Sequence, residues 1–222
     1  MQQLNALIIA AEVTKGMKSM GSKSLLKLKN SILVIEYQIN ELRKHYKNID
    51  ITIATGFESE KMIKALSCYG VKFLHNDKYT TTNQGKSIID YIDTTTTSKL
   101  LIITSGILFK NGFGEMTNDS CVFILDKPKP DFTIGCHNDS DIFYLFYDLP
   151  DKWSECVLLN SQTLLILREL VKVQDLNQMY LFEIMNTLSE HGSVFKKVKI
   201  PKSRIMKISN IKDLTKARSF VQ

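Results

Sequence analysis

The sequence of 222 residues lacks the features of membrane, secreted and zinc-binding proteins. No apolar run approaches the roughly 20 residues that a membrane span requires. The first residues lack the basic and apolar regions of a signal peptide, and the four cysteines (Cys68, Cys121, Cys136 and Cys156) form no C-x-x-C pair. We therefore expect a cytoplasmic protein with reduced, partly buried thiols, no zinc and no membrane span.

The sequence also lacks any shift in composition that would mark a second domain. Apolar residues make up 44% of the chain, which is enough for a sizeable core. We expect one domain over residues 1–222. The net charge of +6 favours an anionic ligand, although charge of this size does not determine a fold.

Strands and helices are expected to alternate in the first half of the chain. The predicted strands are residues 6–11, 49–55, 71–74 and 100–104, and the predicted helices are residues 32–46, 58–66 and 83–92. This order indicates a parallel sheet with right-handed crossovers. Later strand-like runs are residues 121–125, 132–134, 142–147, 157–159, 194–200 and 205–208, and later helices are residues 162–173, 179–189 and 211–220.

The most informative segment is the first strand and the loop after it. The uncharged run 7–11 is typical of a strand that is buried on both faces. A loop that leaves such a strand ahead of a helix is where open α/β sheets hold phosphate groups. The loop continues as Glu12-Val13-Thr14-Lys15-Gly16-Met17, and Lys23 follows six residues later.

This segment resembles the first motif of the sugar-phosphate and choline-phosphate nucleotidyltransferases, Ala-Ala-Gly-x-Gly-x-Arg-Met/Leu followed by Pro-Lys. The matching residues are Ala10, Ala11, Met17 and Lys23. The departures are Glu12 and Thr14 at the two glycines, Gly16 at the arginine and Ser22 at the proline.

Four later segments resemble the same family in the same order. They are residues 33–39, residues 51–57 with Glu60, residues 71–79 with Thr82, Asn83 and Ser87, and residues 208–217. The sequence Asn-Asp-Lys-Tyr at residues 76–79 is most similar to the corresponding segment of choline-phosphate cytidylyltransferases. The resemblance implies a three-layer α/β/α, Rossmann-like nucleotidyltransferase fold with a mainly parallel sheet.

The family resemblance also implies a Mg²⁺ ion that neutralises and orients the phosphates during nucleotidyl transfer. One aspartate after the fourth strand and another before the last helix would hold it. The first position falls within Thr104-Ser105-Gly106, at Ser105 or Gly106, and the second at Ser209, or at Asn210 if the alignment shifts by one residue; none of these is a carboxylate. We therefore expect no metal and no cofactor, with Mg²⁺ needed only if catalysis persists.

The nucleotide-binding positions that the resemblance implies are Ala10, Ala11, Glu12, Lys23, Asn83 and Ser87. Lys23 is the one candidate catalytic residue, because it occupies the position of the family's lysine and would be vestigial if activity is lost. The alternative interpretation is that Lys23 is an ordinary solvated surface lysine. Glu12 would repel phosphate. Thr82 and Asn83 could instead serve as turn or capping residues.

Two further patterns have ordinary explanations. Asp139-Ser140-Asp141 has the Asp-x-Asp form of metal-dependent glycosyltransferases, but we interpret residues 138–141 as a solvated turn. The basic run from Lys196 to Lys207 alternates with apolar residues, which indicates a half-buried edge strand whose lysines face outwards.

Three functions remain open. The favoured one is a catalytically degenerate nucleotidyltransferase-like pseudoenzyme that keeps a nucleotide-binding or structural role. The second is an active cytidylyltransferase that uses other acids, such as Glu12, and transfers a nucleotidyl group from CTP to a small phosphorylated acceptor. The third is a basic interaction module with a protein partner. A nucleotide or a phosphorylated small molecule is the expected ligand, and nucleic acid is not.

Overall fold

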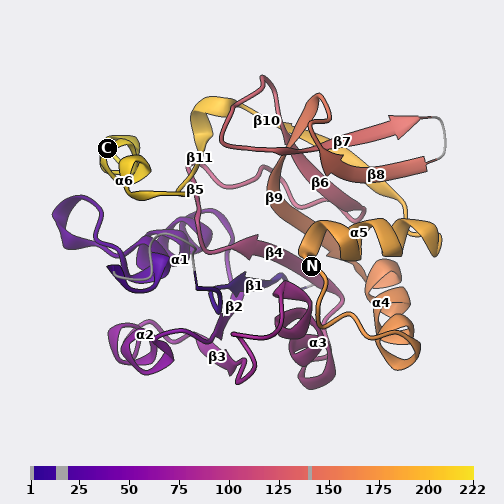
Figure 1. The fold of residues 1–222 in the computed structure, drawn as a ribbon, viewed down its shortest axis with the longest axis horizontal. Coiled ribbons are helices and arrows are strands. Elements are labelled where there is room, and N and C mark those ends of the chain that lie inside the picture. Colours follow the sequence, from indigo (N-terminus) through magenta and orange to yellow (C-terminus); the bar gives the residue numbers. More distant parts are fainter. Residues whose placement is uncertain (1–2, 14–19, 140–141) are drawn as a thin grey trace.

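The computed structural model describes residues 3–13, 20–139 and 142–222 (Figure 1). The helices are α1 (Val34–His45), α2 (Ser59–Ala65), α3 (Gln84–Thr94), α4 (Ser161–Val173), α5 (Leu181–Glu190) and α6 (Ile211–Phe220). The strands are β1 (Asn5–Ile9), β2 (Asp50–Thr55), β3 (Lys72–His75), β4 (Lys99–Thr104), β5 (Ile107–Phe109), β6 (Ser120–Leu125), β7 (Ile134–Asp139), β8 (Ile142–Tyr147), β9 (Asp151–Asn160), β10 (Phe195–Ile200) and β11 (Ile205–Lys207).

One large sheet organises the chain. Its strands follow the order β10-β6-β9-β4-β1-β2-β3, and the β7–β8 hairpin joins it through β9. Among the described strands of this row, only β9 runs antiparallel to its neighbours. The sheet is therefore mainly parallel, and the four strands predicted in the first half of the chain lie side by side in it.

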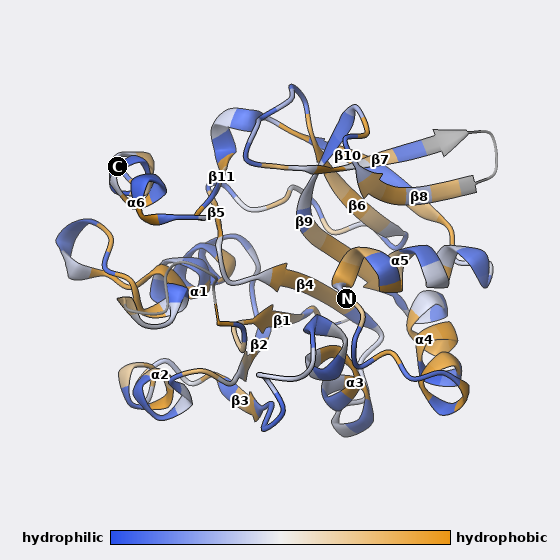
Figure 2. Cartoon of the chain, in the orientation of Figure 1, coloured by the Kyte–Doolittle hydropathy of each residue, from blue (hydrophilic) through white to orange (hydrophobic). Residues whose placement is uncertain are grey.

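Apolar cores cover both faces of the sheet. Leu7 and Ile9 of β1 belong to the core beneath α3, α4 and α5, whereas Ala6 and Ile8 belong to the core beneath α1 and α2. Alternate residues of a strand point to opposite faces, so a strand that is covered on both sides is apolar throughout. Figure 2 shows these apolar strands between helices with polar outer sides. The predicted three-layer α/β/α fold is confirmed.

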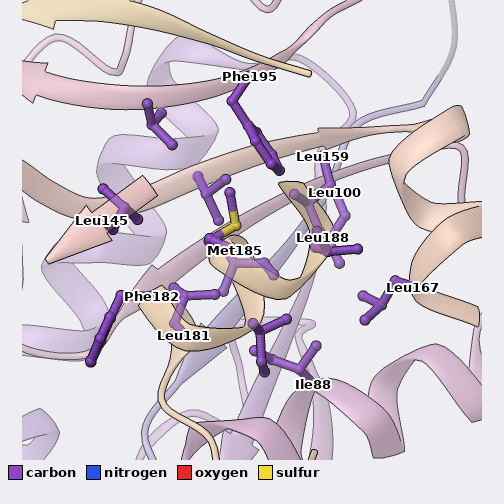
Figure 3. Close-up of a cluster of buried hydrophobic side chains, with 14 of the residues drawn as sticks. Ile88, Leu100, Leu145, Leu159, Leu167, Leu181, Phe182, Met185, Leu188 and Phe195 are labelled. Atoms are coloured by element: carbon purple, nitrogen blue, oxygen red, sulfur yellow. The ribbon is translucent and has the colours of Figure 1, made fainter. Parts of the chain in front are cut away.

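The first of these cores joins elements that are distant in the sequence. Figure 3 shows side chains from strands and from three helices converging there: Ile88, Leu100, Leu159, Leu167, Met185 and Leu188. Such contacts fix how the helices sit on the sheet, and they fix the place of the loops at the ends of its strands.

Two predictions in the later half were wrong. Residues 132–134 were expected to be a strand, but β7 begins only at Ile134. Phe132 lies in a turn, where its N–H donates to the carbonyl of Lys129, and its side chain is buried. Residues 138 and 139, expected to lie in a turn, are paired in β7 with β8. Strand pairing decides the backbone there, because local propensity is weak where a partner strand is present.

The sequence also concealed most of β9 and all of β5. Between Val122 and Ile124 of β6 the pairing advances two residues, while on β9 it advances four, from Val157 to Trp153. Glu155 lies in this bulge with a φ of 62°. The bulge interrupts the alternation that would otherwise reveal the strand.

The cysteines agree with the prediction of free thiols. Cys68 is exposed, and Cys121, Cys136 and Cys156 are buried, with all four free. Within the described residues, no helix has both the length and the apolar character needed to cross a membrane. That the chain forms a single domain remains a prediction.

Candidate functional site

The carboxyl ends of β1 and β4 meet at one edge of the sheet. Ile9 pairs with Thr104, and the N–H of Ser105 donates to the carbonyl of Ile9 at 3.0 Å. The N–H of Ala10 donates to the carbonyl of Ala54 in β2 at 2.9 Å. The loops after parallel strands open at this edge, so the segments that the sequence singled out lie together.

The loop after β1 is tightly packed where the structure describes it. Ala10 and Ala11 are buried, whereas Glu12 is exposed. A Cβ atom at Gly56 would lie 2.7 Å from the carbonyl oxygen of Ala11 and 2.6 Å from Cβ of Tyr79, so only glycine fits there. Thr14, Gly16 and Met17, on which part of the family comparison depends, lie outside the described residues.

A small hollow lies beside this loop. Its lining residues come from the ends of β1 and β3 and from the start of α3: Ile9, Ala11, Glu12, Asn76, Tyr79, Thr82, Asn83, Gln84 and Ser87. Its volume of about 10 Å³ is roughly the room that one water molecule needs. The fold thus brings together four of the predicted binding residues, Ala11, Glu12, Asn83 and Ser87, while Ala10 and Lys23 do not line the hollow.

Two side chains of the hollow differ in their hydrogen bonding. Asn83 stands at the N-terminus of α3, but its amide donates to the carbonyl of Gln178 at 2.6 Å and does not cap the helix. Ser87 is buried, and its hydroxyl has no hydrogen-bond partner among the described residues. A buried unsatisfied hydroxyl is unfavourable, so Ser87 is available to a water molecule or a ligand. Their role in binding remains a prediction.

Lys23 begins a short 3₁₀ turn (Lys23–Leu25) and reaches across to the turn after β4. A Cβ atom at Gly106 would lie 2.7 Å from Nζ of Lys23, so the ammonium group rests directly on that glycine. Burial lowers the pKa of Lys23, while the charges of Glu12 and Glu155 act to raise it. Lys23 is therefore not the freely solvated lysine of the alternative interpretation.

An ion pair that the sequence did not predict lies next to Lys23. Lys207 of β11 pairs with Oε1 of Glu155, and the hydroxyl of Thr104 donates to Oε2 of Glu155 at 3.3 Å. The side chains of Lys207 and Glu155 are only 21% and 17% exposed. We call Lys23, Glu155 and Lys207 the charge cluster. No motif reveals it, because Glu155 enters from the β9 bulge and Lys207 from a short strand paired with β5.

The positions of the family's metal ligands do not fit a metal ion. Ser105 is buried, Gly106 lies beneath Lys23, and Ser209 is exposed. The nearest carboxylate to Ser209 in the sequence, Asp213, accepts hydrogen bonds from the N–H groups of Ser209 and Asn210 and so caps α6.

Other potential metal ligands are not clustered in the described part of the chain. Within the described residues, no group of three or more His, Cys, Asp or Glu side chains could hold a metal ion. The undescribed stretch 14–19 contains no acidic residue. Because Mg²⁺ at phosphate sites needs only one or two carboxylates besides the phosphates themselves, the expected absence of a metal remains a prediction.

Gln38 of α1 holds the turn after β4 in place. It is fully buried, and its amide donates to the carbonyls of Thr104 and Ile107 at 3.1 and 2.7 Å. Gln38 belongs to the segment 33–39 that resembles the family's helix. The structure thus gives this match a physical reason, namely support for the backbone on which Ser105 and Gly106 stand.

A larger hollow, of about 600 Å³, lies at the opposite edge of the sheet. Its lining includes the first residues of β1, β2 and β3 and the threonine-rich stretch between α3 and β4. Ligands of open α/β sheets bind beyond the carboxyl ends of the strands, not the amino ends. We therefore place the candidate site at the smaller hollow and the charge cluster.

The remaining patterns from the sequence have structural roles. β10 is the edge strand that the basic run predicted, and two of its lysines are paired, Lys196 with Asp119 at 2.6 Å and Lys197 with Asp151 at 2.8 Å. Asp139 belongs to β7, and residues 140–141 of the Asp-x-Asp pattern lie outside the described residues.

Comparisons with known proteins agree on the fold. No protein-family model matches the chain, and no curated protein matches it. A CTP:phosphocholine cytidylyltransferase from Streptococcus pneumoniae is similar in structure, with a TM-score of 0.79 and 19% identity over 99% of this chain and 100% of that one. An inositol-1-phosphate CTP transferase from T. maritima has a TM-score of 0.74 and 12% identity over 100% and 98% of the two chains.

A third solved structure extends this comparison. A nucleotidyl transferase from Methanothermobacter thermautotroptrophicus has a TM-score of 0.67 and 17% identity over 99% of this chain and 98% of that one. These likenesses show that the chain has the nucleotidyltransferase fold along nearly its whole length.

Proposed function

We propose that this protein is a nucleotidyltransferase-like pseudoenzyme that binds a nucleotide or a phosphorylated small molecule without transferring a nucleotidyl group. The observation that carries the proposal is the replacement of metal ligands at Ser105, Gly106 and Ser209, with the Lys23 ammonium resting on Gly106. Nucleotidyl transfer builds negative charge on a triphosphate, and a metal ion contributes several kcal/mol to stabilising it.

The ligand class follows from charge and from the shape of the edge. The chain carries a net charge of +6, and Lys23 stands at the position of the family's lysine. The similar structures are named for reactions of CTP with phosphocholine or inositol-1-phosphate, which makes CTP and choline phosphate the first compounds to test. Because the hollow has room for about one water molecule, binding requires its walls to move apart.

The catalytic part of the proposal is tested by an assay of pyrophosphate release. CTP and UTP are supplied with Mg²⁺ and with choline phosphate or sugar phosphates, and we expect no turnover at an enzyme-like rate. Turnover of about 1 s⁻¹ or more, within the usual range for enzymes, that is abolished by Glu12→Gln would support the active cytidylyltransferase instead.

The binding part is tested by calorimetry with nucleotides and choline phosphate. We expect Lys23→Ala to weaken binding and Glu12→Gly to strengthen it, because the first removes a phosphate-seeking cation and the second removes a repelling carboxylate. Affinity that is unaffected by both changes, and lost when Lys196 and Lys197 are neutralised, would move the binding surface to β10 and favour the interaction module.

A further inference from the structure

Side chains of the protein itself fill the place where the family resemblance would put a metal ion. Nζ of Lys23 rests on Gly106, and Lys207, two residues before Ser209, pairs with Glu155. The N–H of Ile208 donates to the carbonyl of Gly106 at 2.9 Å, which ties β11 to the turn after β4. The first of the two positions expected to carry metal-binding aspartates is therefore in contact with Lys23 at Gly106, and the second, Ser209, lies two residues after Lys207.

We infer that Lys23 and Lys207 supply the positive charge that a divalent cation would otherwise provide, so that the site receives the phosphate groups of its ligand without metal. Glu155 holds Lys207 until the incoming phosphate takes its place. This inference rests on the proposed function, since it concerns how the same edge of the sheet binds its anionic ligand.

The balance of charge in the cluster supports the inference. Among the described residues, Lys207 is paired with Glu155, and the charges of both Glu12 and Glu155 act on Lys23, so two ammonium groups face two carboxylates. A divalent cation placed there would meet two like charges and a carboxylate that is already paired. A phosphate group would instead replace the carboxylate of Glu155 at Lys207, and lysine is a common phosphate ligand in proteins.

The backbone of Glu155 also supports a specific role for this residue. Its φ of 62° is left-handed, a conformation that a glutamate adopts only at a cost. The β9 bulge imposes this conformation and directs the carboxylate to Lys207 and to the hydroxyl of Thr104. The pair is mostly shielded from water, so its electrostatic interactions are screened less than those on an open surface. Exchange of the carboxylate for a phosphate therefore changes the interaction energy of the Lys207 ammonium more than the same exchange on an open surface would.

The experiment is calorimetry with two probes, inorganic pyrophosphate and CTP, each in EDTA and in MgCl₂. The wild type is compared with Lys207→Gln and Glu155→Gln. Lys197→Gln is the matched control, because Lys197 also pairs with a carboxylate but lies on β10. Circular dichroism establishes that each variant is folded. The conservative amide in Glu155→Gln keeps the size of the side chain and removes only its charge.

We expect the wild type to bind both probes in EDTA at least as tightly as in MgCl₂. Lys207→Gln should weaken binding about tenfold, the effect of losing one charge-assisted contact, and Glu155→Gln should strengthen it by a similar factor. Lys197→Gln should have no effect. Binding that needs Mg²⁺, or that responds equally to Lys207→Gln and Lys197→Gln, overturns the inference and leaves the proposed function standing.

The remaining outcomes separate the two proposals. If the wild type binds neither probe but Glu155→Gln binds them in EDTA, the inference holds and the proposed binding function of the natural chain fails. If no variant binds either probe in either buffer, the inference is wrong, and calorimetry with choline phosphate then decides the proposed function.

Discussion

The hollow and the charge cluster lie along the same edge of the same sheet, yet they are built in opposite ways. In the hollow, the hydroxyl of Ser87 is buried with no partner among the described residues, and most of the lining side chains are polar. In the charge cluster, Glu155 is already satisfied by Lys207 and Thr104. One half of the edge keeps groups that a ligand could use, and the other half satisfies its own charges.

The largest effect is expected from Gly85→Ala, on the α3 side of the hollow. A Cβ atom at Gly85 would overlap the carbonyl oxygen of Leu176 and would lie 3.1 Å from that of Met179, the acceptor for the N–H of Gly85. Since the obstacle is backbone, we expect a loss of about 3 kcal/mol in the free energy of unfolding. Denaturant titration measures it. Ser87→Ala, two residues along the same helix, is the control, and an equal loss in both variants would contradict the argument.

The next largest effect is expected from Gln38→Leu, beneath the charge cluster. The substitution leaves the carbonyls of Thr104 and Ile107 without their buried donor. A buried group that loses its partner costs about 1–3 kcal/mol, so we expect a loss of about 2 kcal/mol in the free energy of unfolding. Lys44→Ala, at an exposed position of α1, should change it little. Stability that is unchanged by Gln38→Leu would mean that the turn after β4 does not need this support.

The same contrast explains how much of the structure could be predicted from the sequence. The run Leu7 to Ala11 and residues 100–103 of β4 are uniformly apolar because both faces of the sheet are covered, so these strands and their order could be predicted. Part of the lining of the hollow could be predicted, since Asn83 and Ser87 have a helical spacing and match a segment of the family. The charge cluster was not, because Glu155 and Lys207 come together only through a bulge and a three-residue strand, which have no periodicity.

A smaller effect, dependent on pH, is expected from Lys23→Met. Burial lowers the pKa of Lys23 in the folded chain below its ordinary value of 10.5, so between these two values the unfolded chain binds more protons. The contribution of Lys23 to stability therefore rises as the pH rises through this window. We expect Lys23→Met to be more stable than the wild type at neutral pH, with a difference that shrinks toward pH 10.5.

This experiment must separate Lys23 from the tyrosines. Burial raises the pKa of Tyr46 and Tyr91 to about 12, so above pH 10 the unfolded chain loses their protons first and stability falls. Subtracting the two stability curves, wild type and Lys23→Met, cancels this shared contribution. A difference that does not vary with pH would show that Lys23 is hydrated in solution.

The smallest effect on stability is expected from Ser87→Ala in the hollow. Its hydroxyl makes no hydrogen bond to the described residues, so its removal leaves no partner unsatisfied. We expect the free energy of unfolding to change by no more than about 0.5 kcal/mol. Binding of CTP should respond differently, because a ligand that uses this hydroxyl loses one hydrogen bond, worth about 1 kcal/mol, or roughly a fivefold loss of affinity. Calorimetry measures the affinity of Ser87→Ala for CTP, with Ser67→Ala at an exposed position as the control. It shows whether the Ser87 hydroxyl binds the ligand or only fills space in the core. Unchanged affinity in both variants would place the ligand outside the hollow and leave the charge cluster as its only anchor among the described residues.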